Sequence, residues 1–196
     1  QLPGIRLQLV GRGAVIFVIG LALEFLHTPI AVILTLYGLL YVAVIPFLRW
    51  KPWQLLAGAA VLAIAGPPAV AALSAVTLEP YGAGIAFVLD GSYSIVVWMA
   101  LVLAGLALGR MHVATLRTAW IALGAGVALA VVGYGLGAIG ADVVRRVDGA
   151  EPLMGGSGGG WDGYPEALAA ADPIGAMLRA FFAVEPHSGG VAEVLG

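Results

Sequence analysis

Charged side chains are absent from four long stretches of this chain, each at least 19 residues in length. These uncharged stretches are Ile30–Leu48, Pro52–Leu78, Gly91–Gly109 and Thr118–Ala141. A helix needs about 20 apolar residues, rising 1.5 Å each, to cross the hydrocarbon core of a bilayer. A shorter apolar stretch, Gly13–Leu23, ends at Glu24. The pattern predicts an all-α polytopic integral membrane protein, a bundle of about five transmembrane helices.

Prolines and tryptophans set the limits of these predicted helices. We expect membrane spans at about 13–26, 30–48, 53–75, 92–109 and 116–141. Pro29 should separate the first two spans, because proline lacks an amide hydrogen and restricts the residue before it. Pro67 and Pro68 lie inside the third span, where they should kink or interrupt the helix. Trp50 and Trp53 lie beside basic residues, a pattern typical of anchors at the membrane interface.

The distribution of basic residues predicts the orientation of the bundle. Six of them fall on one side of the predicted spans: Arg6, Arg12, Arg49, Lys51, Arg110 and Arg117. The positive-inside rule places that side, with the start of the chain, in the cytoplasm. We expect residues 142–190 to be extracytoplasmic.

The segment after the last span divides into two parts. Residues 149–163 are rich in glycine and predict a loop. Asp172 and Pro173 then resemble an N-cap and a first helical residue. Apolar residues follow on one face of a short amphipathic helix, which could lie in the interface or re-enter the bundle. Residues 191–196 should begin a further helix.

Composition excludes several classes of function. Only 10% of the residues are charged and 61% are hydrophobic, whereas soluble domains are about 25% charged. The net charge of −2 argues against a nucleic-acid partner and leaves the lipid bilayer as the expected one. The chain has no cysteine, and its three histidines are scattered. We therefore expect no metal site.

Two pairs of glycines have the spacing that lets membrane helices approach closely. They are Gly105 with Gly109 and Gly133 with Gly137. We expect contacts within the bundle rather than a dimer interface, although a homo-oligomer stays open.

A few polar residues near the membrane are candidates for a site. Glu24 and His27 are three residues apart, so on one helical face they can touch and bind substrate, or form an interfacial pair wetted by headgroups. Asp90 and Tyr93 precede the fourth span, where Asp90 can bind substrate or cap the helix. The alternatives for each pair stay open at this point.

The segment before the last predicted helix holds the most suggestive polar cluster. Glu185, His187 and Ser188 place a carboxylate, an imidazole and a hydroxyl together. Such groups can transfer protons or bind sugar hydroxyls, and the alternative is a capped turn. Arg110 and Arg117 could bind a phosphorylated cofactor from the cytoplasm, or anchor the helices by the positive-inside rule.

Two segments give the chain a resemblance to a known family. Ser92–Trp98 followed by Gly105–Arg110 resembles the "YPxxxW…GxxLGR" segment of the DUF418/YeiB-like and DUF1624 membrane proteins. Pro186–Gly189 followed by Glu193–Gly196 resembles the "PHSGT…E.LGS" segment of actinobacterial members. The Arg12-Gly13 pair and the passage from His27 to Gly38 also fit. These proteins are relatives of heparan-alpha-glucosaminide N-acetyltransferase.

The resemblance implies a membrane-embedded acyltransferase of the bacterial plasma membrane. Such a protein moves an acyl group from acyl-CoA to a cell-envelope sugar, or to another glycan or lipid acceptor. His187, with Glu185, would be catalytic, and Ser188 would bind substrate. Arg110 and Arg117 would face acyl-CoA.

The chain departs from the family pattern at several places. Ser94 stands where proline is usual, and Gly190 stands where threonine is usual. The family's "LDxxRG" helix, and the histidine that follows it, are not in this sequence. We therefore expect an interior piece of a longer protein that is inactive alone.

Two functions of other classes compete with the acyltransferase. A small-molecule or lipid transporter or flippase would use helices broken at Pro29 and at Pro67-Pro68 to form a midplane site. A non-catalytic subunit of a membrane complex would need no polar cavity.

Overall fold

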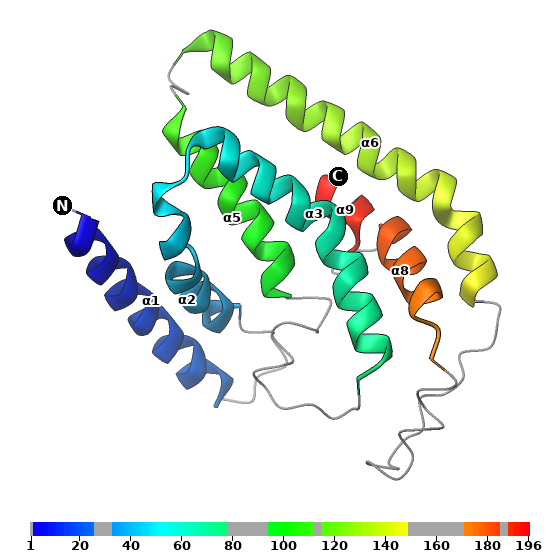
Figure 1. Ribbon diagram of the computed structural model, residues 1–196, viewed down its shortest axis with the longest axis horizontal. Helices are drawn as coiled ribbons and strands as arrows, with labels where there is room; N and C mark the ends of the chain where they lie inside the picture. The colour runs from blue at the N-terminus through cyan, green and yellow to red at the C-terminus, as the bar shows by residue number, and fades with distance from the viewer. Residues whose placement is uncertain (1, 26–32, 78–93, 112–114, 149–170, 185–187) are drawn as a thin grey trace.

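The computed structural model describes residues 2–25, 33–77, 94–111, 115–148, 171–184 and 188–196. These residues form helices and contain no strand (Figure 1). The α-helices are α1 (Leu2–Glu24), α2 (Leu34–Ala43), α3 (Pro52–Ala75), α5 (Ile95–Arg110), α6 (Leu116–Asp148), α8 (Pro173–Phe182) and α9 (Val191–Leu195). A 3₁₀ helix, η1 (Ile45–Arg49), joins α2 to α3. The all-helical class is confirmed.

Three helices in the described part of the chain are long and apolar enough to cross a membrane. These stretches are Gly4–Leu23, Pro52–Ala75 and Leu116–Val143. The apolar helices α2 and α5 have 10 and 16 residues, so they extend over about 15 Å and 24 Å. Both are shorter than the roughly 30 Å of a bilayer core. Three such helices fit a membrane protein, and the count of five full spans stays a prediction.

Two of the long helices extend beyond their expected limits. α1 begins at Leu2 rather than near residue 13, because Arg, Gln and Leu are all good helix formers and the intervening polar residues do not end the helix. α6 continues to Asp148 rather than ending near residue 141. An exposed ion pair between Asp142 and Arg145, one turn apart, lies on this added segment.

The second expected span is interrupted at Pro46. α2 ends at Ala43, and the chain continues as η1 rather than as α-helix to residue 48. The amide of Phe47 donates to the Val44 carbonyl and the amide of Trp50 donates to the Phe47 carbonyl, both at 3.0 Å. The tighter 3₁₀ turn follows from proline, which has no amide hydrogen to continue the α-helical ladder.

The third expected span is continuous across its two prolines. Pro67 and Pro68 lie inside α3, which stays helical from Pro52 to Ala75. Neither proline can donate to the carbonyl four residues earlier, which weakens the helix on that side. Figure 1 shows α3 bending along its course. The sequence therefore predicted the kink, and the helix is not broken.

The core of the protein lies between α2, α3 and α5. Its largest fully buried side chains include Leu36 of α2, Leu55 of α3 and Leu103 of α5. The rings of Tyr37 and Trp98 meet edge to face at a centroid distance of 5.6 Å and join α2 to α5. Burial of these side chains fixes the three helices against one another.

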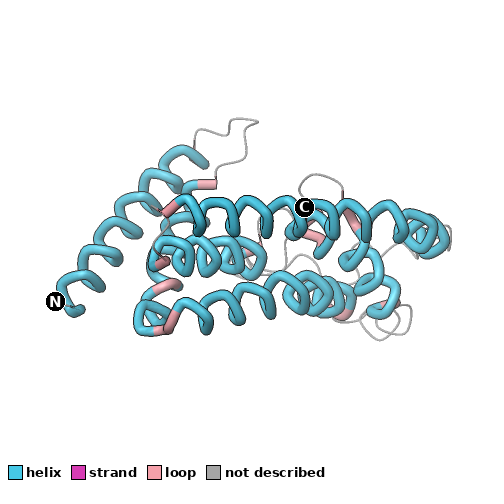
Figure 2. The backbone as a smooth tube through the Cα atoms, turned by 90° about the horizontal axis from the view of Figure 1, so that it is seen from above, coloured by secondary structure: helices cyan, strands magenta, loops and turns pink. Residues whose placement is uncertain are grey.

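Glycines allow α1 to lie directly on α2. A Cβ atom at Gly13 would lie 2.7 Å from the Gly38 carbonyl oxygen, and one at Gly20 would lie 2.5 Å from the Thr35 amide nitrogen. The pairing of Gly13 with Gly38 and of Gly20 with Thr35 makes the two helices antiparallel. Figure 2 shows α1, which begins at the end marked N, inclined to the helices that run horizontally in this view.

The two glycine pairs with membrane-helix spacing behave differently. A Cβ atom at Gly133 would lie 2.5 Å from the Ala192 carbonyl oxygen, and one at Gly137 would overlap the Val184 side chain. This pair therefore packs α6 against α9 and the residues after α8, as expected for a contact within the bundle. Gly105 and Gly109 have no described atom within 4 Å of such a Cβ.

The short helix α8 packs against α3 and α6 (Figure 1). Asp172 caps it, since its Oδ1 accepts a hydrogen bond from the Gly175 amide at 2.8 Å, and Pro173 is the first helical residue. Both features were expected from the sequence. Ile174, Met177 and Leu178 are exposed in the isolated chain, which leaves an apolar side of α8 open to lipid.

Removing the cap of α8 should destabilise this end of the bundle. The substitution Asp172→Ala should lower the free energy of unfolding by about 1 kcal/mol, because the Gly175 amide loses its acceptor. Thermal unfolding of the detergent-solubilised protein would measure the effect. Asp142→Ala is the control, because Asp142 forms only an exposed ion pair of little energetic value. Equal unfolding temperatures for the two variants would contradict the role of the cap.

Candidate functional site

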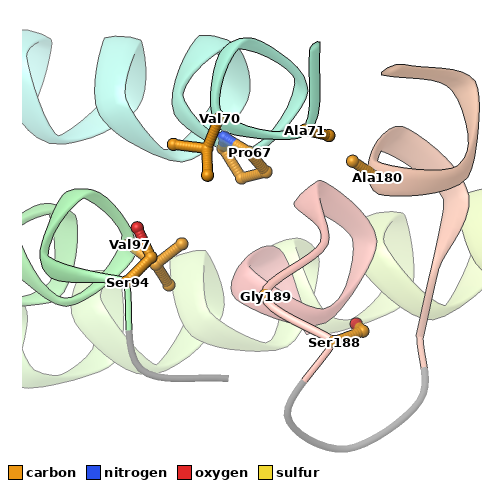
Figure 3. Close-up of a pocket in the computed structure, with 8 residues that line it drawn as sticks. All are labelled: Pro67, Val70, Ala71, Ser94, Val97, Ala180, Ser188 and Gly189. Atoms are coloured by element: carbon orange, nitrogen blue, oxygen red, sulfur yellow. The ribbon is translucent and has the colours of Figure 1, made fainter. Parts of the chain in front are cut away.

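A small cavity lies where α3, α5, α8 and the turn before α9 meet (Figure 3). Its volume is about 70 Å³, enough for a few water molecules. The residues that line it are Pro67, Val70, Ala71, Ser94, Val97, Ala180, Ser188 and Gly189. The walls are mostly apolar, and the hydroxyls of the two serines are the polar side-chain groups among these lining residues.

The cavity brings together two segments that are far apart in the sequence. Ser94 precedes α5, and Ser188 and Gly189 precede α9. In Figure 3, Ser94 and Val97 lie across the cavity from Ala180 and Ser188. Each serine belongs to one of the two segments that carry the family resemblance. α3 completes the wall at its bend, through Pro67.

Ser188 and Gly189 are held by a carboxylate from α9. Oε2 of Glu193 accepts hydrogen bonds from Ser188 Oγ at 2.9 Å and from the Gly189 amide at 2.7 Å. The Gly190 amide donates to Ser188 Oγ at 3.2 Å. Glu193 is the third residue of α9, and its carboxylate reaches back past the N-cap Gly190 to the turn before the helix. The turn therefore has a single well-defined arrangement.

Two glycines are required by this arrangement. Gly189 has φ of 65°, a left-handed conformation that glycine adopts without a steric penalty. A Cβ at Gly190 would lie 2.5 Å from the Ala183 carbonyl oxygen. This contact explains why the chain can hold glycine here but not the threonine that the resembled family has.

Ser94 is buried, with an exposed fraction of 1%. Its side chain lies at the start of α5 and is hydrogen-bonded. The residue therefore adds a satisfied hydroxyl to the cavity wall, where the family pattern has proline.

Arg110 is half-buried, and its guanidinium contacts the backbone. Its guanidinium donates from Nη2 to the Leu48 carbonyl at 2.8 Å and from Nη1 to the Trp50 carbonyl. These bonds tie the end of α5 to the end of η1. Arg117 is exposed near the start of α6. The expectation that both arginines bind acyl-CoA stays a prediction, with Arg117 the more accessible of the two.

Several other candidate residues lie outside the part of the chain that the structure describes. These are Asp90, Tyr93, Glu185, His187 and His27. Glu24 is the last residue of α1, but its side chain is not among those that the structure describes. Among the candidates for substrate binding, Ser188 is therefore the one that the structure places in the cavity.

Sequence reasoning missed Glu193 and Pro67 as members of the site. Glu193 was noted only as part of a family motif. A glutamate at the third position of a helix can reach back to the residues before that helix, a local signal that could have shown its role. Pro67 was noted for its effect on α3, and nothing local in the sequence indicates which residues its ring contacts.

Comparison with known proteins gives no family for the chain. No protein-family model, no curated protein and no solved structure matches it. The family resemblance therefore rests on its motifs, and the activity that it implies is a proposal.

Proposed function

We propose that the chain forms part of a membrane-embedded acyltransferase, which moves an acyl group from acyl-CoA to a cell-envelope sugar or similar acceptor. One observation carries this proposal. The two motif segments, which are distant in sequence, both contribute residues to the cavity, through Ser94 on one side and Ser188 on the other. Convergence on one cavity is expected of residues that act together on a substrate.

The proposal assigns a role to each part of the site. His187 is the proton acceptor, and it immediately precedes Ser188 in the chain. The acyl donor approaches from the end of the bundle where η1, α3 and α5 meet, because Arg49, Lys51 and Arg110 lie there. A phosphorylated donor is attracted to such a cluster of cations.

A transporter or flippase is the alternative. The feature that favours it is the pair of prolines in α3, since Pro67 lines the cavity. α3 stays helical across both prolines, however, whereas a midplane transport site is formed by discontinuous helices. The acyltransferase therefore accounts for more of the described residues.

Binding of acyl donors to the full-length protein tests the proposal. A ligand that binds only the folded state stabilises it by about 2.7 kcal/mol at 100 times its dissociation constant. Acetyl-CoA or a longer acyl-CoA should therefore raise the unfolding temperature in a saturable way. Arg117→Ala should weaken this shift in unfolding temperature. His187→Ala should abolish acyl transfer but preserve the shift.

A matched control separates donor binding from a general effect of charge. Arg145 is an exposed arginine on the added segment of α6, and Arg145→Ala should leave the donor-induced shift unchanged. Absence of a shift and of acyl transfer with every donor tried would overturn the proposal. The remaining hypotheses would then be a transporter and a non-catalytic subunit.

A further inference from the structure

Ser188 lines the cavity, and the hydrogen-bond polarity of its hydroxyl is fixed by its neighbours. A serine hydroxyl has one hydrogen to donate and two lone pairs to accept with. The hydrogen is used on Glu193, because an ionised carboxylate can only accept. One lone pair is used by the Gly190 amide. The second lone pair has no donor among the described residues.

The size of the cavity limits what can reach this lone pair. A volume of about 70 Å³ is enough for a few water molecules or for a small functional group of a larger ligand. Apolar atoms of Pro67, Val70 and Val97 form most of the surrounding wall. A polar group that enters must therefore find its hydrogen-bond partner in the serines or in the turn, since an unpaired buried polar group is costly.

We propose that Ser188 Oγ binds the hydrogen of the acceptor substrate's hydroxyl or amine, and that Glu193 is the positioning residue that fixes this polarity. The inference rests on the proposed acyltransferase function and names the part of the reaction that this end of the cavity serves. It assigns Ser188 to the group that receives the acyl chain rather than to acyl-CoA.

The thioester carbonyl of the donor does not suit the same position. A carbonyl oxygen only accepts hydrogen bonds, so it would meet the lone pair of Ser188 without a hydrogen between them. The Gly189 amide cannot supply the missing hydrogen to this carbonyl, because the amide already donates to Glu193. The alcohol or amine, which carries a hydrogen, is the complementary ligand.

Steady-state kinetics of the full-length protein test this assignment. Ser188→Ala should lower kcat/KM for the acceptor roughly tenfold, as the loss of about one hydrogen bond predicts, and leave the KM for acyl-CoA unchanged. Glu193→Ala should have a similar effect, whereas Glu193→Gln should be close to wild type, because an amide oxygen can replace Oε2. Thr118→Ala, on α6, is the control and should change neither constant. An equal rise in the KM for acyl-CoA would overturn the assignment.

A second experiment decides the inference if no acyl transfer is found. This sequence contains no cysteine, so in Ala180→Cys, which keeps Ser188 intact, a thiol in the cavity wall can be followed by its rate of alkylation. The probes are 2-propanol and acetone, which share a carbon skeleton and differ in carrying a hydroxyl or a carbonyl. At equal concentration, 2-propanol should slow alkylation several-fold more than acetone. Equal protection, or none, would overturn the proposed polarity independently of the proposed function.

Discussion

Arg110→Ala should lower the free energy of unfolding by about 3 kcal/mol, one of the two largest effects that we expect. The guanidinium donates to the carbonyls of Leu48 and Trp50. Its removal breaks two charge-assisted hydrogen bonds at the end of η1, one part-buried and one exposed, and hydrogen bonds to charged groups contribute about 1.5–3 kcal/mol each. Thermal or denaturant unfolding of the purified protein would measure the loss.

Two further variants separate the structural role of Arg110 from donor binding. Arg110→Lys keeps the charge but not the two-pronged geometry, so it should fall between wild type and alanine. Arg117→Ala removes an exposed arginine and should leave stability nearly unchanged while weakening acyl-CoA binding. If Arg110→Ala were as stable as Arg117→Ala, the contacts with η1 would contribute nothing to folding.

Gly38→Leu should separate α1 from α2, with a loss of about 3 kcal/mol or more. A Cβ at this position would lie 2.6 Å from Phe17 Cβ and 2.7 Å from both the Gly13 carbonyl oxygen and the Phe17 amide nitrogen. Two of these three atoms belong to the backbone of α1, so no change of rotamer relieves the overlap. The whole of α1 would have to move.

Gly105→Leu provides the matched control. It introduces the same side chain into the apolar helix α5, at a glycine with no described atom within 4 Å of an added Cβ. The unfolding temperature should fall strongly for Gly38→Leu and little for Gly105→Leu. A similar fall for both variants would show that helix composition, rather than the close approach of α1 to α2, determines the effect.

The hydrophobic pattern predicted the general class of the protein well. Uncharged stretches indicate membrane helices because the cost of a charge in hydrocarbon is large and local to the sequence. The cap at Asp172 and the bend in α3 were also predictable, since both depend on neighbouring residues. The start of α1 was missed, because the predicted span began near residue 13 with the uncharged stretch, although the preceding arginine, glutamine and leucine residues favour helix.

Contacts between distant residues could not be predicted in the same way. Gly105 and Gly109 have the same spacing as Gly133 and Gly137, yet only the second pair contacts another described segment. Arg110 follows the end of an apolar run, a position typical of an interface anchor, and nothing nearby indicates that it binds η1. The partner in each case is chosen by the tertiary arrangement, to which a single sequence gives no direct access.

The cavity wall is formed by segments that are synthesised at different times, because its lining residues run from Pro67 to Gly189. Chains emerge from the ribosome N-terminus first, at about 5–20 residues per second. α3 and α5 can therefore pack together before Ala180, Ser188 and Gly189 have been made. Until the turn held by Glu193 arrives, the bend of α3 faces lipid or a neighbouring protein instead of a closed wall. The site is thus assembled late, and a nascent chain halted before residue 188 would carry α2, α3 and α5 of the core but not the turn that completes the cavity.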